Sequence, residues 1–387
     1  MNHVVYLDNH ATTPADPRVI EAMLPTFSQV FGNAASGQHA FGRAAFEAVE
    51  DARSQVAALI GGSAQDIVFT SGATESDNLA IKGVAEAQPD KRHIISSPTE
   101  HHAVLDCLAR LGRAGYQIDF LPVDAFGQPE ISALEKMIRA DTLLVSVMSA
   151  NNEVGTVAPL VEIGRIARSH DVPFHSDAAQ MVGKLRIDVD EMNIDLLSIS
   201  GHKLYGPKGI GALYVRRRPP VPIQPIIDGG GHERGLRSGT LNVPGCVGLG
   251  KACEIAGESM LSEMERTLGL RQMLMKLLLE QLDDVELNGH PEMRLPGNLN
   301  LCFKGADADS LMLMVPEVAM SSGSACTSAS PEPSYVLLAM GKPYDEASQC
   351  IRFGIGRFNT SDEIAFAADR VTVAVRKLRA MAGVLAQ

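Results

Sequence analysis

The chain has 387 residues, enough for one large domain or two, with ample sequence to bury a core. It carries 34 Lys and Arg against 46 Asp and Glu, so its net charge is −12 at pH 7. A surface of this sign repels a phosphate backbone, which argues against direct binding of nucleic acids.

Cysteine usage and the lack of long apolar segments predict a soluble, cytoplasmic protein. The six cysteines, at positions 107, 246, 253, 302, 326 and 350, form no CxxC pair and are too sparse for a disulfide framework, so we expect reduced thiols. The N-terminus has no basic region that would begin a signal peptide. The longest apolar stretch, residues 311–320, is about half the ~20 residues that span a bilayer, so we expect no membrane partner.

The first two thirds of the chain have the pattern of an α/β sheet. Short β-branched runs alternate with stretches of helical period, as expected when parallel strands are joined by crossover helices. Strands are predicted over residues 66–70, 93–96, 118–123, 143–148, 173–175, 196–200 and 211–215. Because ligands bind beyond the carboxyl ends of strands in such sheets, we expect the chemistry in the segments that follow these strands.

The pattern changes after a Pro-rich stretch at residues 216–222. A long amphipathic helix is predicted over residues 258–284, a strand over 298–303 and a further helix over 361–381. These elements predict a second, α+β domain, with a boundary near residue 255.

The first candidate for chemistry is the predicted strand that runs into Ser71-Gly72-Ala73-Thr74 and then into a helix. Backbone N–H groups and the Thr74 hydroxyl would converge there with the helix dipole behind them, which suits a phosphate group. An ordinary capped turn has the same residues, since Ser and Thr cap many helices that bind nothing. The chain has no GxGxxG after a strand and no GK[ST], so a phosphate here would belong to a cofactor other than a nucleotide.

The second candidate is the pair Asp177 and Lys203, each near the end of a predicted strand. A carboxylate and a lysine at neighbouring strand ends are what pyridoxal phosphate requires, since the lysine forms a Schiff base and the acid partners the pyridinium nitrogen. A helix-capping aspartate and a solvated lysine are the ordinary alternatives. Lys203, however, lies between an apolar strand and a Gly-Pro-rich turn, an unusual position for a solvated lysine.

The third candidate is Cys326. A free cysteine is usually a small buried hydrophobe, and this fits Cys107, Cys253 and Cys302, which have apolar neighbours. Cys326 instead stands in the polar segment 321–333, for which we expect an exposed, mobile loop carrying a thiol. A catalytic role would need a nearby base or positive charge, because an unperturbed thiol of pKa ~8.5 is mostly protonated near pH 7.

Ten stretches, in order along almost the whole chain, together resemble the cysteine desulfurases of the class V aminotransferase family. They are residues 6–14, 69–78, 99–101, 151–155, 175–180, 200–206, 230–235, 237–240, 321–327 and 351–353. The Ser-Ser-Gly-Ser-Ala-Cys-Thr run at 321–327 is similar to the long-loop branch that serves iron–sulfur cluster assembly. The resemblance implies a fold type I pyridoxal-phosphate enzyme, with a mostly parallel seven-stranded sheet in a large domain and a smaller α+β C-terminal domain.

The resemblance also implies domain bounds and a cofactor site. Residues 15–255 would form the large cofactor-binding domain, and residues 1–14 with 256–387 the small domain that carries the loop at 321–333. Lys203 would bind pyridoxal 5'-phosphate covalently, Asp177 would pair with its pyridine nitrogen, and Gln180 would hydrogen-bond its phenolic oxygen. The phosphate would be held by five residues, the last of them from the other subunit of a homodimer: Ala73 through its backbone, Thr74, Ser200, His202 and Thr240.

The remaining implied roles concern substrate and sulfur. Asn152 and the ring of His101 would position the cofactor, with His101 also transferring protons. Arg352 and Asn33 would bind the substrate carboxylate, since a guanidinium fits it in a bidentate manner. Cys326 would take the sulfur of L-cysteine as a persulfide, leaving L-alanine. No resident metal is expected, although Cys326 could ligate a transferred iron–sulfur cluster.

The partners are left partly open by the sequence. A sulfur-acceptor protein such as an iron–sulfur cluster scaffold is implied, but the chain stops at Gln387 without the longer tail by which housekeeping members dock their scaffold. A nitrogen-fixation or stand-alone role therefore stays open. The alternatives are a selenocysteine lyase or another enzyme of this fold, and a cofactor-free sulfur carrier or scaffold.

Overall fold

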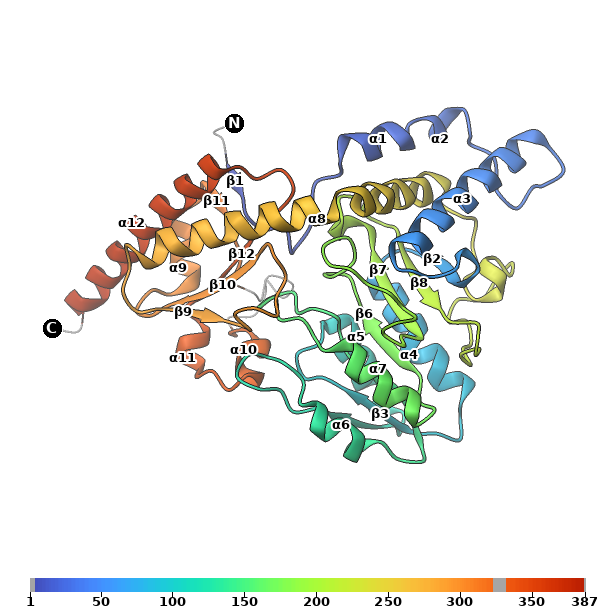
Figure 1. Cartoon of the computed structure of the whole chain (residues 1–387), viewed down its shortest axis with the longest axis horizontal. Helices are drawn as coiled ribbons and strands as arrows, with labels where there is room; N and C mark the ends of the chain where they lie inside the picture. The colour runs from blue at the N-terminus through green and yellow to red at the C-terminus, as the bar shows by residue number, and fades with distance from the viewer. Residues whose placement is uncertain (1–3, 323–331, 386–387) are drawn as a thin grey trace.

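The computed structural model describes residues 4–322 and 332–385. Its larger β-sheet contains seven described strands in the order β2-β8-β7-β6-β5-β3-β4 (Figure 1). Their bounds are β2 Ile67–Thr70, β3 His93–Ser96, β4 Gln117–Phe120, β5 Thr142–Ser146, β6 Phe174–Asp177, β7 Leu196–Ser200 and β8 Gly211–Val215. Strands β3 to β7 pair in parallel, whereas β8 runs antiparallel to both β7 and β2. The predicted mostly parallel seven-stranded sheet is confirmed, and β3, β7 and β8 agree with the prediction residue for residue.

Helices cover both faces of this sheet, because successive side chains of its strands point to opposite sides. Phe69 and Val145 pack into a core with α3, α7 and α8, whereas their neighbours Val68 and Leu144 pack into another core with α4 and α5. The helices of this part are α3 Ala40–Leu59, α4 Ala73–Ala87, α5 His102–Arg113, α6 Ile131–Met137, α7 Leu160–Ser169 and α8 Val243–Leu279. The result is a three-layer α/β structure.

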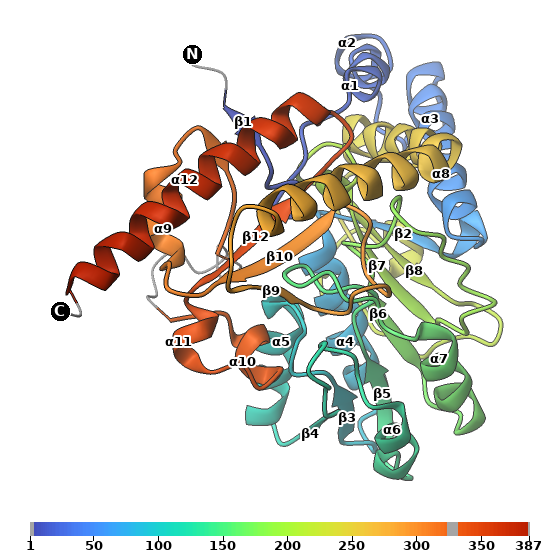
Figure 2. The same cartoon turned by 60° about the vertical axis from the view of Figure 1, so that its left-hand side comes forward.

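Helix α8 has 37 residues and runs from the large sheet to the C-terminal part of the chain (Figures 1 and 2). The sequence predicted a helix over 258–284, so the prediction missed its first four turns. Those turns contain glycines, which weaken the helical signal but allow close packing: a Cβ on Gly250 would lie 2.6 Å from Ala52 Cα of α3, and one on Gly248 would lie 2.7 Å from Met23 Sδ. The predicted boundary at residue 255 lies inside this helix, and the division into two domains stays a prediction.

The C-terminal part contains an antiparallel sheet in the order β12-β10-β9 and its own apolar core. The strands are β9 Val285–Asn288, β10 Asn298–Phe303 and β12 Cys350–Gly354, and a parallel pair joins β1 Val5–Tyr6 to β11 Val318–Ala319. The helices are α9 Ala308–Met314, α10 Tyr335–Ala339, α11 Tyr344–Ala347 and α12 Ser361–Leu385. The predicted strand over 298–303 is confirmed, whereas β9 and β12 were not predicted.

The N-terminal segment ties the C-terminal part to the large sheet. Leu7 N–H donates to Ala319 O at 2.9 Å, and Thr13 N–H donates to His202 O at 2.9 Å, before the chain enters α1 Pro17–Met23 and α2 Pro25–Ser28. The five cysteines in the described residues are all buried and free, which confirms the prediction for Cys107, Cys253 and Cys302. Within 4–322 and 332–385, no helix is long and apolar enough to cross a membrane.

Candidate active site

A cavity of about 400 Å³ lies where the parallel strands of the large sheet end. Asp177 ends β6, Ser200 ends β7, and Ser71 follows β2, so three strands deliver side chains to it. Nine of the predicted site residues line this cavity: Ala73, Thr74, His101, Asn152, Asp177, Gln180, Ser200, His202 and Lys203. A volume of this size suits a small organic ligand.

One end of the cavity is the N-terminus of α4. The first helical hydrogen bond runs from Ser76 N–H to Gly72 O, so the N–H groups of Ala73 and Thr74 have no helical acceptor. Gly72 has φ 153°, and a Cβ on Gly211 would lie 2.6 Å from Gly72 Cα, so both positions need glycine to let the chain pass close to the cavity. This end presents donors and the positive end of a helix dipole, as an anion requires.

The negative charge of an acid beside that helix end, Glu75, is balanced by donors within the chain. The carboxylate of Glu75 accepts a hydrogen bond from Ser71 N–H at 2.8 Å and forms an ion pair with Arg237, whose Nε lies 2.8 Å away. Burial alone would raise the pKa of Glu75, but these two donors lower it below its usual value. The carboxylate therefore does not oppose an anion at the helix end.

Lys203 and Asp177 face the same cavity from neighbouring strands. Lys203 is the last residue of the 3₁₀ turn Gly201–Lys203, and its Nζ donates to the carbonyl oxygens of His10 and Ala11. Asp177 is 5% exposed, and its Oδ1 accepts from Ala179 N–H at 2.9 Å. Burial, and then repulsion from Asp77, raises the pKa of Asp177 to about 6.

His101 and Asn152 line the wall between these two ends. His101 caps α5, and its Nδ1 accepts from Ala103 N–H at 3.1 Å, so the proton of the neutral ring is on Nε2. Burial lowers the pKa of His101, so the ring is neutral near pH 7. Within the described chain, Asn152 Oδ1 is buried without a hydrogen-bond partner, which a bound ligand would supply.

Arg352 is placed beside this wall but already holds a carboxylate. Its Nη2 lies 2.7 Å from Asp8 Oδ1, and its Nη1 donates to Asn152 O at 2.9 Å. Its Nε is buried and has no partner in the described part of the chain. Sequence reasoning missed Asp8, although it lies in the stretch 6–14 that carries the resemblance. That Arg352 binds a substrate carboxylate stays a prediction.

Two predicted residues are not brought to the cavity within one chain. Asn33 is exposed, and its Oδ1 accepts from Ala35 N–H at 2.9 Å in a local turn. Thr240 is exposed as well and does not line the cavity. Their roles, including that of Thr240 in the other subunit, stay predictions.

Cys326 lies outside the described residues, but both flanks of its segment are described. Before it, the backbone of Ser321 pairs with that of Arg352, with N–H···O distances of 3.2 and 2.6 Å. After it, Ser334 is buried, and its hydroxyl donates to the carboxylate of Glu153, which follows a cavity-lining asparagine. The chain therefore enters and leaves this segment next to the walls of the cavity.

Beneath the cavity, Asp77 of α4 and His175 of β6 form a fully buried pair. Asp77 Oδ1 lies 3.5 Å from His175 Nε2, and the ring also contacts the hydroxyl groups of Ser146 at 2.8 Å and Ser198 at 3.1 Å. Burial raises the pKa of Asp77 to about 7 and lowers that of His175 to about 4. Asp77 is therefore largely neutral below pH 7, which limits its repulsion of Asp177.

We expect Asp77→Asn to flatten the pH dependence of stability. The folded protein binds a proton on Asp77 up to about pH 7, whereas the unfolded chain loses it near the usual value of 3.8. Asp77 therefore destabilises the wild type as the pH rises from about 4 to 7, by at most about 1.4 kcal/mol per unit, and the asparagine variant lacks this contribution. Thermal unfolding between pH 5 and 8 measures this.

The control is Asp106→Asn, because the Asp106 side chain is 81% exposed in the ion pair with His102 and its replacement should leave the pH dependence unchanged. Parallel curves for wild type and Asp77→Asn would contradict the assignment of a neutral, buried acid.

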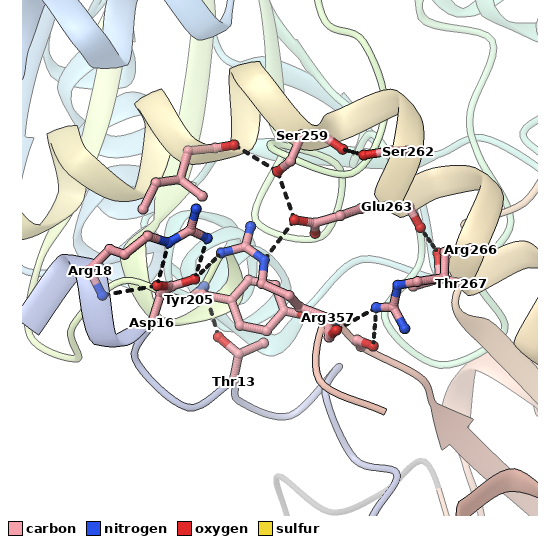
Figure 3. A network of polar contacts seen from close by, with 12 residues as sticks. Thr13, Asp16, Arg18, Tyr205, Ser259, Ser262, Glu263, Arg266, Thr267 and Arg357 are labelled. Atoms are coloured by element: carbon pink, nitrogen blue, oxygen red, sulfur yellow. Dashed lines mark hydrogen bonds and ion pairs between the residues drawn. The ribbon is translucent and has the colours of Figure 1, made fainter. Parts of the chain in front are cut away.

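A polar network behind Lys203 joins four segments of the chain (Figure 3). The Arg357 guanidinium lies between two carboxylates, with Nη1 2.8 Å from Asp16 Oδ2 and Nε 2.7 Å from Glu263 Oε1 of α8. It also lies 4.2 Å from the centroid of the Tyr205 ring, a cation–π contact. Tyr205 follows Lys203 by two residues and has φ 65°, which is unfavourable for a side chain, so the network holds a strained turn at the lysine.

We expect Arg357→Met to reduce the free energy of unfolding by about 3 kcal/mol, because it leaves the Glu263 carboxylate without its ion-pair partner and Asp16 with Arg18 alone. The Arg357 and Asp16 side chains are 8% and 2% exposed. Urea unfolding measures the loss. Arg186→Met removes a 67% exposed arginine that also bridges two carboxylates, and should leave the midpoint almost unchanged. Equal midpoints for both variants would show that the network does not stabilise the fold.

The comparisons with known proteins cover almost the whole chain. The family model for class-V aminotransferases matches residues 5–366. A protein named cysteine desulfurase IscS, from Anaeromyxobacter dehalogenans (strain 2CP-C), is 56% identical over 378 residues, covering 97% of this chain and 94% of the relative. The cysteine desulfurase of Homo sapiens is 50% identical over 378 residues, covering 97% of this chain and 83% of that protein.

Solved structures share the same architecture. A structure named NifS-like protein has a TM-score of 0.90 at 37% identity and covers 97% of this chain and 100% of its own. A second, SspA in complex with cysteine, has a TM-score of 0.82 at 39% identity and covers 92% of this chain and 100% of its own. The similarity therefore extends over both sheets and over the segments that line the cavity.

Proposed function

This chain belongs to the class-V aminotransferase family, and we propose that it is a cysteine desulfurase, which converts L-cysteine to L-alanine and transfers the sulfur to Cys326 as a persulfide. The observation that carries the proposal is that one cavity gathers Lys203, Asp177 and Gln180 with the start of α4. The names of the relatives, which are cysteine desulfurases, favour this function over a selenocysteine lyase or a cofactor-free carrier.

The residues of the cavity fit pyridoxal phosphate. Its phosphate would bind the free N–H groups and the Thr74 hydroxyl at the start of α4, with Ser200 and His202 beside them. The buried Asn152 Oδ1, which has no partner in residues 4–322 or 332–385, would gain one from the ligand. When bound, the cofactor supplies an electron sink for the carbanion that forms at the substrate Cα.

The lysine and the aspartate would control the protons of this reaction. Lys203 Nζ, which two backbone carbonyls hold at the cavity, would remove the proton from the substrate Cα. With a pKa of about 6, Asp177 is largely ionised at pH 7 to 8, and a cationic ring nitrogen beside it would favour the carboxylate further. Asp177 would thereby keep the proton on that nitrogen. The proton-transfer role of His101 stays a prediction: because its Nδ1 already accepts from Ala103 N–H, the neutral ring would donate its Nε2 proton rather than accept the proton of the Cys326 thiol.

Sulfur transfer then needs one nucleophile. The Cys326 thiolate attacks the substrate sulfur, so that a new S–S bond forms and the Cβ–S bond breaks. The electron pair of the broken bond remains with carbon, which takes up protons to give alanine, and the persulfide keeps the sulfur. The anchoring of the segment at Ser321 and Ser334 supports this step, because it brings both flanks of the thiol to the cavity.

The direct experiment is to incubate the pure protein with L-cysteine and a reductant and to measure alanine and sulfide together. We expect equal amounts of alanine and sulfide, and a yellow protein whose absorbance is lost on reduction with borohydride. A colourless protein that cannot be reconstituted with pyridoxal phosphate would refute the proposal.

We propose further that the protein is a homodimer and that it acts in a reducing cytoplasm. There it would deliver sulfur to an acceptor such as an iron–sulfur cluster scaffold. Five large apolar side chains on and between α1, α2 and α3 are more than half exposed: Leu24, Phe27, Phe31, Phe41 and Phe46. Such a patch is typical of an interface between copies of a chain. Thr240, which is exposed, would then reach the phosphate of the partner subunit.

We expect Thr240→Ala to weaken cofactor affinity about ten- to a hundredfold in a protein that remains dimeric, because one hydrogen bond to a charged group is lost. Equilibrium dialysis and light scattering measure the two quantities. Thr360→Ala removes another threonine hydroxyl, one that lies at the start of α12 and outside the lining of the cavity, and serves as the control. Unchanged affinity in Thr240→Ala, or a monomeric wild type, would contradict the cross-subunit contact.

A further inference from the structure

Gln180 is held from behind by two groups that the reaction does not use. Its Oε1 lies 3.0 Å from His10 Nδ1 and 3.2 Å from Lys184 Nζ, while its Nε2 donates to His10 O at 2.9 Å. An ammonium group can only donate and a carbonyl oxygen can only accept, so these contacts determine which way the amide points. One N–H of Nε2 is left for the cavity, which Gln180 lines.

Lys184 is a buried amine whose charge is not balanced. It forms no ion pair with any described residue, and the charges that act on it are the cations of Lys203 and Arg352. Burial, followed by repulsion from these two residues, lowers the pKa of Lys184 to about 7. Uncompensated buried charge costs stability, and an apolar side chain of similar size would avoid that cost. A role in the site explains why an amine is found here.

His10 adds no further positive charge beside Lys184. Burial lowers its pKa well below 6.5, so the ring is neutral. Its Nδ1 carries the proton that Gln180 accepts, which leaves Nε2 as a lone pair without a partner among the described residues. Glu263 of α8 and Tyr205 line a cavity of about 30 Å³ together with His10 and Lys184. The Lys184 charge also acts on His202, where it adds to burial in lowering the pKa of that ring.

We propose that Lys184 is a positioning residue that acts through Gln180: its ammonium group orients and polarises the amide, which then donates a stronger hydrogen bond to the phenolic oxygen of pyridoxal phosphate. This inference rests on the proposed function. A stronger donor at that oxygen, with a cation behind it, would lower the proton affinity of the nitrogen atom that joins Lys203 to the cofactor. The effect weakens above about pH 7, as the ammonium group loses its proton.

The test is a pH titration of the visible absorbance of the holoenzyme. This absorbance reports the protonation of the nitrogen that joins Lys203 to the cofactor, and no turnover is needed. In Lys184→Met the midpoint should rise by about half a unit to one unit, a three- to tenfold increase in proton affinity, because the cation is absent. Lys184→Arg, which keeps the charge and for which the small cavity offers room, should stay near the wild type. Lys184→Gln keeps a donor without the charge and should give an intermediate midpoint.

The control is Lys208→Met, which removes an equal charge from an exposed residue at the rim of the cavity and leaves the Gln180 contacts intact. Equal midpoints in wild type, Lys184→Met and Lys184→Gln would overturn the inference, as would an equal shift in Lys208→Met. Thermal unfolding near pH 7 should show Lys184→Met at least as stable as the wild type. Failure of the wild type to bind the cofactor would instead overturn the proposed function, so the two failures are distinguishable.

Discussion

Lys203→Ala is expected to reduce alanine formation from L-cysteine by at least about 10³-fold, the largest loss among the variants of the cavity. The substitution removes both the amine that links to the cofactor and the base for the Cα proton. The two other lysines of this region are poorly placed to substitute: Lys184 Nζ is bound to Gln180 on the far side of the amide, and Lys208 is exposed at the rim of the cavity. Turnover measured as alanine, with the protein saturated with pyridoxal phosphate, gives the size of the loss.

Two measurements separate loss of chemistry from loss of structure in Lys203→Ala. The variant should bind pyridoxal phosphate reversibly and lose the borohydride-reducible absorbance, because the cavity keeps its phosphate end at α4. Lys276→Ala, on an exposed turn of α8 with the side chain 74% exposed, should retain full turnover. Activity within tenfold of the wild type in Lys203→Ala would remove the lysine from the mechanism.

Cys326→Ala is expected to abolish sulfide release, again by at least about 10³-fold, while the cofactor stays bound with an unchanged spectrum. The described cysteines are poor substitutes as nucleophiles. Burial raises the pKa of Cys107 to about 11 and those of Cys246 and Cys253 to about 12, so their thiols remain protonated at neutral pH.

Cys302 provides the sharpest control for this experiment. A contact with Cys350, its partner across β10 and β12, lowers the pKa of Cys302, yet the side chain is 0% exposed in the core of the small sheet. Cys302→Ala should therefore keep sulfide release. Retained release in Cys326→Ala, or its loss in Cys302→Ala, would contradict a persulfide on Cys326.

Local pattern was enough to predict the elements that carry the reaction. Strand β7 and the Gly-Pro-rich turn after it are encoded within about a dozen neighbouring residues, so Lys203 could be placed at a strand end from the sequence. The same holds for the turn from β2 into α4 and for Asp177. In each case a buried strand changes abruptly to small or polar residues, and that change is a local signal.

Elements whose stability comes from distant partners were missed. The first turns of α8 contain glycines that only make sense against α3, and β12 is defined by its pairing with β10, about fifty residues earlier. The ion pair of Arg352 with Asp8 joins residues 344 positions apart. No window of sequence contains such a contact.

The sequence by itself determined the class of fold, the cofactor and the candidate lysine, aspartate and cysteine, because each depends on a short motif in a recognisable order. Only the tertiary structure showed which side chains contact and orient the residues of the site. The contact between His10 and Gln180 spans 170 positions. The contact between Lys184 and Gln180 spans only 4 positions, yet it matters because the Gln180 side chain is buried and lines the cavity. Burial and long-range proximity set the charge and orientation of these groups, and neither property can be read from composition or periodicity.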